Sequence, residues 1–184
     1  MSIRTEKVAE EIKHQLANIL TRYPARAWRD APLFPTPAGA LDALPQRLAL
    51  ADGARLLDAG CGLGHGLRAL HRAWPRARVE GIESSLPLAL WARRHCRFAR
   101  VHRGDLWARS WADYALVYLF QRPESMAPAL AKARAEMAPG SWLVSLAFAV
   151  PDVAADAVLR CPDGRPLWLY RAGPAVSSPA PRRR

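Results

Sequence analysis

Four glycines lie within seven residues of the segment LLDAGCGLGHG, directly after an acidic residue that ends an aliphatic run. The glycines are Gly60, Gly62, Gly64 and Gly66, and the acidic residue is Asp58. A chain that passes from a strand ending at Asp58 into a helix starting near Gly64 must turn sharply, and a ligand above the turn needs main chain without side chains. The free N–H groups and the positive dipole end of that helix face the same ligand. The segment is therefore a candidate ligand-binding turn.

The spacing of residues around this turn separates the ligands that glycine-rich turns bind. A phosphate-binding loop has Lys followed by Ser or Thr after its last glycine, whereas His65 and Gly66 stand here. A dinucleotide-binding G-x-G-x-x-G counted from Gly60 would need a third glycine where His65 lies. The remaining pattern is D-x-G-x-G-x-G, with Glu83 ending the next expected strand 19 residues after Gly64. A carboxylate there can accept both ribose hydroxyls of a nucleoside, each charge-assisted hydrogen bond contributing about 1.5–3 kcal/mol.

Apolar runs alternate with helix-period segments from residue 54 onward. The runs expected to form buried strands are RLLDA, RVEGIE, FARVH, YALVYLF and WLVSLAFAV, and helices are expected near residues 65–74, 86–97 and 125–137. This alternation predicts an α/β fold with a doubly wound, mostly parallel sheet covered on both faces. The segment DAVLRCPDGRPLWLYR predicts two further strands joined at Pro162-Asp163-Gly164, an antiparallel hairpin that closes the sheet edge.

The two ends of the chain frame this single domain. Residues 5–22 carry an apolar stripe typical of an amphipathic helix, expected to dock on the domain, with a flap facing substrate or membrane as the alternative. A short helix is expected to begin at Pro37, with Thr36 as its cap. The final GPAVSSPAPRRR has too little apolar surface to order itself. We therefore expect an N-terminal helix and linker over residues 1–33, a domain over residues 34–172 and a disordered basic tail over residues 173–184.

Composition excludes several classes of protein. Of the 184 residues, 51% are hydrophobic, but no apolar run reaches the roughly 18 residues of a membrane span, and the N-terminus lacks the apolar stretch of a signal peptide. We expect no membrane span and a cytoplasmic location. The three cysteines Cys61, Cys96 and Cys161 are far apart in sequence and form no Cys-x-x-Cys pair, so neither a disulfide framework nor a zinc site is expected. No metal is expected.

The net charge of +11 raises the alternative of a nucleic-acid-binding protein, because arginine and lysine neutralise phosphates. The basic residues include only three lysines, and the arginines are scattered through a chain also rich in Ala, Pro and Trp. Such a composition fits a biased genome as well as a binding face. The dense basic segments are the terminal PRRR and WARRHCRFARVHR, the second of which is expected to lie partly on a solvated helix face.

Three features in chain order resemble the seven-strand, or class I, S-adenosylmethionine-dependent methyltransferases. LLDAGCGLG is similar to their first motif, Glu83 in VEGIES to their ribose carboxylate, and Asp105 in HRGDLW to the acidic residue that commonly faces the adenine amino group. The resemblance spans about residues 34–172. It implies a Rossmann-like sheet of seven strands whose last strand is reversed, and S-adenosylmethionine as the cofactor.

The same resemblance implies a set of cofactor-binding positions. These are Thr36, Asp58, Gly60, Cys61, Gly62, Gly64, Glu83, Ser84, Asp105 and Leu106. The segment from Thr5 to Leu50 is expected to pack over the carboxyl edge of the sheet and to help enclose the cofactor, with Phe34, Pro35 and Thr36 as contacts. The Cys61 side chain is expected to be a small packed group and not a nucleophile, because no evident base lies nearby.

Several segments carry a narrower resemblance. APLFPTP, GDLW, YALVYLF and PGSWLVSLAFAVPD are similar to the lysine methyltransferase family that includes the enzymes modifying the ATP-synthase c subunit, and to its bacterial relatives. The animal members carry a membrane segment ahead of the domain, and since none is apparent here a membrane-embedded substrate is not expected. QRPESM differs from the Asn or Asp, Pro-Pro and aromatic signature of nucleic-acid amino-methylases, which counts against a base-methylating enzyme of that type.

The methyl acceptor is expected to be an amine, first of all a protein lysine, with a small-molecule amine or RNA as competitors. The residues best placed to take a proton or orient the nitrogen are Tyr118 and Glu124, near the end of the fourth strand, and the alternative is that they are a packed strand residue and a helix-start carboxylate. A charge of +11 repels strongly basic tails, but it tolerates a lysine in an acidic or apolar partner, or an RNA phosphate backbone. The alternative from a different class is a catalytically idle, cofactor-binding partner protein.

Overall fold

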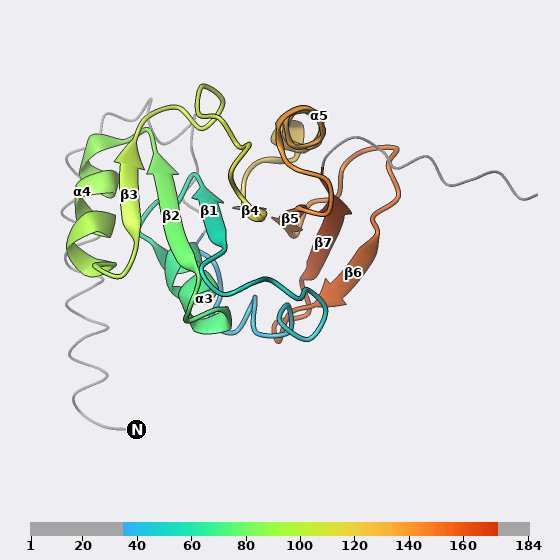
Figure 1. Cartoon of the computed structure of the whole chain (residues 1–184), viewed down its shortest axis with the longest axis horizontal. Helices are drawn as coiled ribbons and strands as arrows, with labels where there is room; N and C mark the ends of the chain where they lie inside the picture. The colour runs from blue at the N-terminus through green and yellow to red at the C-terminus, as the bar shows by residue number, and fades with distance from the viewer. Residues whose placement is uncertain (1–34, 173–184) are drawn as a thin grey trace, which may run out of the picture. The chain divides into compact units, whose positions relative to one another are not determined.

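The computed structural model describes residues 35–172, which form a seven-stranded sheet with helices on both faces (Figure 1). The strand order is β3-β2-β1-β4-β5-β7-β6. The strands are β1 (Arg55–Ala59), β2 (Arg78–Glu83), β3 (Arg100–Arg103), β4 (Leu116–Leu119), β5 (Trp142–Leu146), β6 (Ala157–Arg160) and β7 (Pro166–Arg171). Strands β1 to β5 pair in parallel, whereas β7 pairs antiparallel with both β5 and β6. The predicted Rossmann-like sheet with an antiparallel C-terminal hairpin is confirmed.

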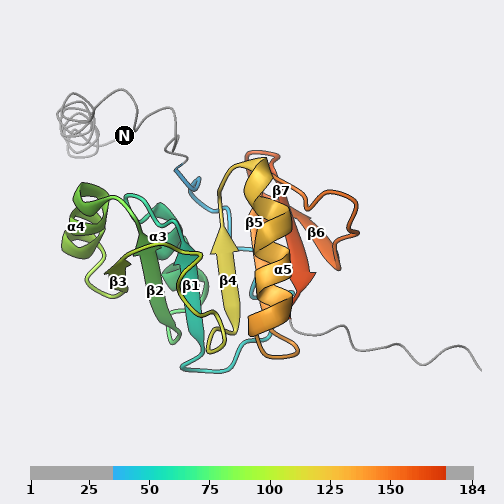
Figure 2. The same cartoon turned by 90° about the horizontal axis from the view of Figure 1, so that it is seen from above.

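In the described chain, three α-helices cover this sheet: α3 (His65–Ala73), α4 (Leu86–His95) and α5 (Met126–Glu136), the last preceded by the short 3₁₀ helix η1 (Pro123–Ser125). Figure 2 shows α3 and α4 on one face of the sheet and α5 on the other. Each helix turns small or aliphatic side chains toward the sheet, for example Leu67 and Leu70 in α3 and Ala129 and Ala133 in α5. Among residues 35–172 no helix has the length and apolar character needed to cross a bilayer.

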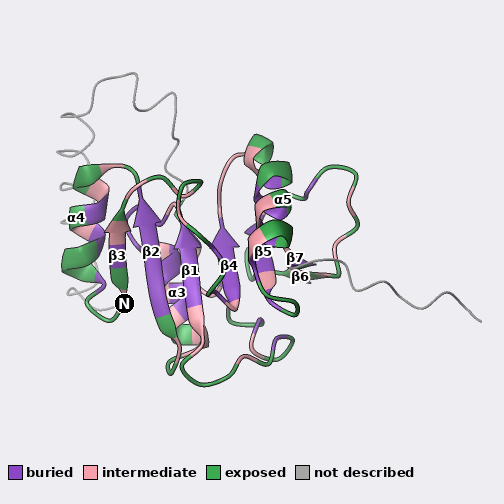
Figure 3. Cartoon of the chain, turned by 45° about the horizontal axis from the view of Figure 1, so that its top comes forward, coloured by how far each residue is buried: buried purple, intermediate pink, exposed green. Residues whose placement is uncertain are grey.

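The core is divided into two layers by the sheet. Successive strand residues point to opposite faces, so Leu56 belongs to the layer beneath α3 and α4 while its neighbour Leu57 belongs to the layer beneath α5. Tyr118 and Val117 divide in the same way. The central strands β1, β2 and β4 are buried along most of their length (Figure 3). Burial on both faces explains why these strands appear in the sequence as nearly continuous apolar runs.

The prediction of a helix beginning at Pro37 is wrong. Residues 38–47 instead form consecutive turns closed by short-range hydrogen bonds, such as that from Ala40 N to Pro37 O (3.2 Å). Gly39 has a φ of 78°, which interrupts a right-handed helix, and Pro45 has no N–H to continue one. The apolar residues of this segment still pack into the core, because Leu41 and Leu44 are fully buried. The amphipathic segment over residues 5–22 and the basic tail lie outside the described residues.

Candidate active site

The chain order of the sheet reverses between β1 and β4. From β1 the chain builds outward through β2 to β3, and it then returns to place β4 on the other side of β1. The segments that leave β1 and β4 at their carboxyl ends lead to helices on opposite faces, α3 and α5. Such a switch point is where ligands bind in open α/β sheets. The glycine turn after β1 and residues 120–125 after β4 are therefore the first segments to consider.

The glycine turn adopts a backbone that side chains disfavour. Gly60, Gly62 and Gly64 have φ values of 87°, 50° and 84°, all in the left-handed region. Gly60 N and Cys61 N both donate to Ile82 O, at 2.9 and 3.0 Å, which ties the turn to the end of β2. A Cβ on Gly64 would lie 2.6 Å from the Cys96 sulfur, so this glycine is also required for packing. The turn thus presents bare main chain to the switch point.

The Glu83 carboxylate is fixed at the end of β2 by the turn itself. Its Oε2 accepts a hydrogen bond from Gly62 N at 2.9 Å, and its Oε1 accepts one from Ser85 N at 2.8 Å. The Ser84 hydroxyl donates more weakly, at 3.4 Å, and the Ser84 side chain is exposed. Each carboxylate oxygen has two lone pairs, so Oε2 can accept one more hydrogen bond, and Oε1 can do so when the exposed Ser84 hydroxyl gives up its long contact. Glu83 is therefore held ready to receive a pair of neighbouring hydroxyl groups.

Asp58 lies buried beneath the turn with an unsatisfied oxygen. Its Oδ2 has no hydrogen-bond partner within residues 35–172, although the residue is only 3% exposed. Burial, together with the nearby charge of Glu83, raises the pKa of Asp58 to about 8, while the backbone N–H of Leu67 opposes the shift. A Cβ on Gly66 would come 2.8 Å from Asp58 Cγ, so the start of α3 packs directly on this carboxyl group. An acid in this position favours a ligand that brings positive charge.

Gln121 was not identified from the sequence as a site residue. It follows β4, and its Nε2 donates to Ala59 O at 3.3 Å, across the switch point. A Cβ on Gly60 would collide with this side-chain nitrogen, so Gly60 makes room for the protein's own amide as well as for a ligand. In the sequence, QRPESM was notable only because it differs from the signature of nucleic-acid amino-methylases. Its position directly after a central strand was the available signal.

The remaining predicted cofactor residues lie on three segments around the turn. Asp105 is exposed after β3, where its Oδ1 accepts a hydrogen bond from Trp107 N (2.9 Å), and Leu106 is partly buried. Gly104 N donates to the backbone carbonyl of Glu83 (3.0 Å), which places the start of the β3–β4 connection at the end of β2. Thr36 is buried, and its hydroxyl shares a hydrogen bond with the Tyr118 hydroxyl at 2.9 Å. Cofactor contacts for these residues stay predictions.

Cys61 packs as the sequence predicted. Its sulfur faces Gly81 in β2, where an added Cβ would lie 2.8 Å away. Burial raises the pKa of the Cys61 thiol, and the charges of Asp58 and Glu83 add to this. All three cysteines are free thiols. In the described part of the chain, no three His, Cys, Asp or Glu side chains are grouped so that they could hold a metal ion.

The two residues nominated for catalysis occupy different environments. Tyr118 is 1% exposed, and burial raises the pKa of its hydroxyl well above its ordinary value although the hydrogen bond with Thr36 opposes this. A hydroxyl that ionises so reluctantly is poorly suited to receive a proton. Glu124 is exposed within η1, before the first turn of α5. A catalytic role for either residue stays a prediction.

A second charged cluster anchors the connection between β3 and β4, residues 104–115. The buried Glu80 of β2 accepts hydrogen bonds from Arg55 Nε (3.0 Å), Arg109 Nη2 (3.0 Å) and the Tyr114 hydroxyl (3.1 Å), and His102 Nε2 lies 2.9 Å from it. Burial alone would raise the pKa of Glu80, but the hydrogen bonds with His102 and Arg55 outweigh it and lower the pKa. Because Arg109 and Tyr114 belong to the same connection as Asp105, the cluster helps to position that residue.

The fold and the sequence match those of the class I S-adenosylmethionine-dependent methyltransferases. Residues 58–157, more than half of the chain, match the family described as the ANTKMT methyltransferase domain, and the chain belongs to this family. The trans-aconitate 2-methyltransferase of Azoarcus sp. (strain BH72) is 38% identical over 73 residues, which span 40% of this chain and 28% of that enzyme. The chain therefore corresponds to less than a third of that relative.

Solved structures share the fold. The RNA methyltransferase from Salinibacter ruber, in complex with S-adenosyl-L-homocysteine, has a TM-score of 0.68 at 23% identity over 78% of this chain and 96% of that chain. The pyocyanin biosynthetic protein PhzM has a TM-score of 0.58 at 14% identity over 73% of this chain and 54% of that chain. At these identities the likeness concerns the fold and not the acceptor.

The residues of the turn suit S-adenosylmethionine, the cofactor of this class. Glu83 can take the two ribose hydroxyls, and the glycine turn admits a ligand close to the main chain. The unsatisfied Asp58 oxygen suits a cofactor that carries a positive sulfonium and an ammonium group. When bound, the cofactor supplies a methyl group already activated by the positive sulfur.

Cofactor binding is expected to release a proton from Asp58. The pKa of about 8 means that this carboxyl group is mainly protonated near neutrality, and a positively charged ligand above it lowers the pKa. Linkage then requires that affinity rises with pH up to about 8 and levels off above it. Calorimetry in two buffers with different ionisation enthalpies measures the protons released. Asp58→Asn is the control and should remove this release, whereas release that persists in the variant would assign the proton to another group.

Proposed function

We propose that this enzyme transfers the methyl group of S-adenosylmethionine to a lysine side chain of a protein. The observation that carries the proposal is the match of residues 58–157 to the ANTKMT methyltransferase domain. The resemblance of APLFPTP and GDLW to lysine methyltransferases supports it, as does the absence of the base-methylase signature from QRPESM.

In methyl transfer the protein mainly positions the reacting groups and excludes water. In an in-line displacement the lysine nitrogen forms a bond to the methyl carbon while the carbon–sulfur bond breaks, and the electron pair remains on sulfur. The lysine ammonium must first lose a proton to solvent water, because an ammonium has no lone pair. Glu83 and the glycine turn hold the cofactor. We assign to Gln121 the orientation of the incoming amine, because its Nε2 is used by Ala59 O and its amide oxygen has no partner in the described chain.

Gln121→Ala is expected to lower kcat about tenfold, the effect of losing one hydrogen bond that orients the nitrogen. Affinity for S-adenosylhomocysteine is expected to change less than about twofold, since Glu83 and the turn remain. Gln121→Asn keeps the amide but shortens its reach, so an intermediate kcat is expected. Steady-state kinetics beside calorimetry separate the two effects. An unchanged kcat would remove Gln121 from the acceptor side.

The acceptor class can be tested directly with tritiated cofactor. The protein is incubated with labelled S-adenosylmethionine and an extract of a strain that lacks it, and the product is divided between protease and ribonuclease. Label that protease releases, and that amino-acid analysis recovers as methyllysine, supports the proposal. Glu83→Ala protein provides the background. Label that survives protease and disappears with ribonuclease would end the lysine hypothesis in favour of RNA, and no label above background would favour an idle cofactor-binding protein.

A further inference from the structure

The positive charge of the described chain is concentrated in one stretch. Residues 65–103 contain nine arginines and two carboxylates, Glu80 and Glu83, both of them buried in β2. Residues 104–172 contain seven basic and seven acidic side chains, and residues 35–64 contain two basic and three acidic side chains. A genome-wide preference for arginine would add arginines throughout, but it would not remove surface carboxylates from one stretch alone. The imbalance therefore belongs to the surface formed by α3, α4 and β3.

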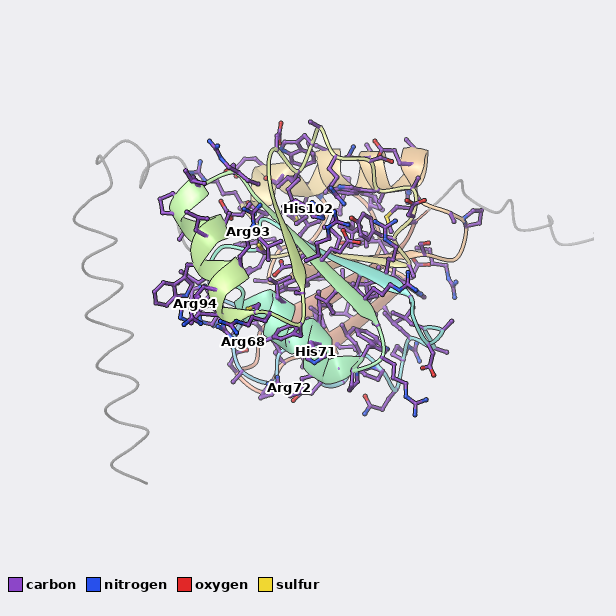
Figure 4. All side chains as sticks on the ribbon, turned by 60° about the vertical axis from the view of Figure 1, so that its left-hand side comes forward. Arg68, His71, Arg72, Arg93, Arg94 and His102 are labelled. Atoms are coloured by element: carbon purple, nitrogen blue, oxygen red, sulfur yellow. The ribbon has the colours of Figure 1, made fainter. Side chains whose placement is uncertain are left out.

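Four of these arginines, Arg68, Arg72, Arg93 and Arg94, lie on the two helices that cover one face of the sheet. Helices α3 and α4 cover the same face of the sheet beside the edge strand β3, and Figure 4 shows Arg68, His71 and Arg72 of α3 continuing the row of Arg93 and Arg94 of α4. We call this region, with the exposed Arg97 and Arg100 that follow α4, the α3–α4 basic surface.

Part of this surface has no carboxylate partner among residues 35–172. Within residues 35–172, Arg72 pairs with Asp42 and Arg76 with Asp52, both exposed, and the Nε of Arg93 donates to Val101 O. Arg94, Arg97 and Arg100 make no ion pair with any described residue. No carboxylate of residues 35–172 occupies these three guanidinium groups, and arginine binds phosphate with two parallel hydrogen bonds.

Flat rings lie among the arginines. His71 stacks on Phe98 with a centroid separation of 4.3 Å, and Trp91 stacks on His95 at 4.0 Å. Phe98 is 41% exposed although it is aromatic. Aromatic faces between phosphate-binding arginines are the means by which proteins hold unpaired nucleotides, because every base can stack on a ring. A surface that bound phosphate alone would have no use for an exposed ring.

We propose that the α3–α4 basic surface binds single-stranded RNA, with phosphates on Arg94, Arg97 and Arg100 and an unpaired base on Phe98. RNA is chosen because unpaired loops and ends are its usual recognition elements. Cys96, which ends α4, packs its sulfur against Gly64, so the surface begins close to the glycine turn. The surface adjoins the glycine turn but is formed by side chains to which methyl transfer assigns no role, and the proposal does not depend on the acceptor being lysine.

The test uses the full chain and a fluorescent oligouridine of about 20 nucleotides, with anisotropy measured from about 50 to 200 mM KCl. Wild-type affinity should fall steeply with salt. The triple variant Arg94→Gln, Arg97→Gln, Arg100→Gln should bind at least about tenfold more weakly at low salt, and its logarithmic salt slope should be smaller by about two, at about 0.7 per phosphate contact. Phe98→Ala should weaken binding about fivefold or more.

A matched control removes the same charge elsewhere. Arg47→Gln, Arg134→Gln, Arg160→Gln neutralises three exposed arginines outside the surface and should leave RNA affinity nearly unchanged. Equal losses in both triple variants would overturn the proposal, because net charge alone would then explain binding. Retained S-adenosylhomocysteine binding in each variant verifies that the variant is folded. A loss of RNA binding can then be distinguished from a failure of the proposed methyltransferase function.

Three other ligands distinguish the sources of the interaction. An oligothymidine and a duplex RNA of equal length should bind more weakly than oligouridine. Equal binding of the duplex would overturn the role of Phe98, and tighter binding of oligothymidine would overturn the choice of RNA. Vesicles containing phosphatidylglycerol that bind through the same arginines, in the absence of oligouridine binding, would replace RNA with an anionic membrane.

Discussion

Glu83→Ala is expected to reduce the affinity for S-adenosylhomocysteine by at least about 100-fold. Two ribose hydrogen bonds to a charged acceptor are lost, each contributing about 1.5–3 kcal/mol. The same change removes the acceptor of Gly62 N and Ser85 N, so the glycine turn loses the group that fixes it to the end of β2. Calorimetric titration measures the affinity, and the melting temperature of the unliganded protein reports the effect on the turn.

Glu83→Gln tests whether the charge or only the shape matters. One oxygen becomes an NH₂ group, which must then face the N–H of either Gly62 or Ser85, a contact between two donors. We therefore expect a loss of affinity close to that of Glu83→Ala in spite of the similar volume. Asp52→Asn, at an exposed ion pair with Arg76, is the control and should bind normally. Normal binding by Glu83→Ala would mean that the nucleoside is not held at this turn.

Glu80→Ala is expected to lower the free energy of unfolding by about 3 kcal/mol, as is typical when one partner of a buried charge cluster is removed. Arg55, Arg109 and the Tyr114 hydroxyl would lose their shared acceptor, and the Glu80 side chain they surround is only 10% exposed. Urea unfolding followed by circular dichroism measures the change. Cofactor affinity should fall as well, because residues 104–115 carry Asp105 and lose their anchor.

Asp113→Ala provides the comparison for this experiment. Asp113 also pairs with Arg55, at 2.7 Å, but its side chain is 74% exposed. Solvent screening limits such a pair to less than about 1 kcal/mol. If the two variants lose equal stability, the Glu80 cluster does not anchor the connection as described. A normal cofactor affinity in Glu80→Ala would separate the cluster from the site.

The sequence by itself determined the central sheet, the three helices that cover it and the principal turn of the site. Strands such as RLLDA and RVEGIE could be predicted because burial on both faces requires continuous apolar runs. Helices α3 and α5 could be predicted because the spacing of their apolar residues matches a helix. The glycine turn was readable because left-handed backbone selects glycine locally. Glu83 followed from its place at the end of a strand. Each of these signals depends on neighbours in the chain.

Only the tertiary structure decided which distant residues meet. Gln121 reaches Ala59 across 62 positions, Tyr118 is paired with Thr36 across 82, and the unsatisfied Asp58 oxygen results from burial that no local pattern encodes. The excess of arginine over carboxylate in residues 65–103 can be counted in the sequence, but Arg68, Arg72, Arg93 and Arg94 share one face because α3 and α4 cover the same side of the sheet. The segment after Pro37 does not form the predicted helix, because Gly39 and Pro45 interrupt regular hydrogen bonding. Its leucines are nevertheless buried by tertiary packing, as the apolar spacing predicted.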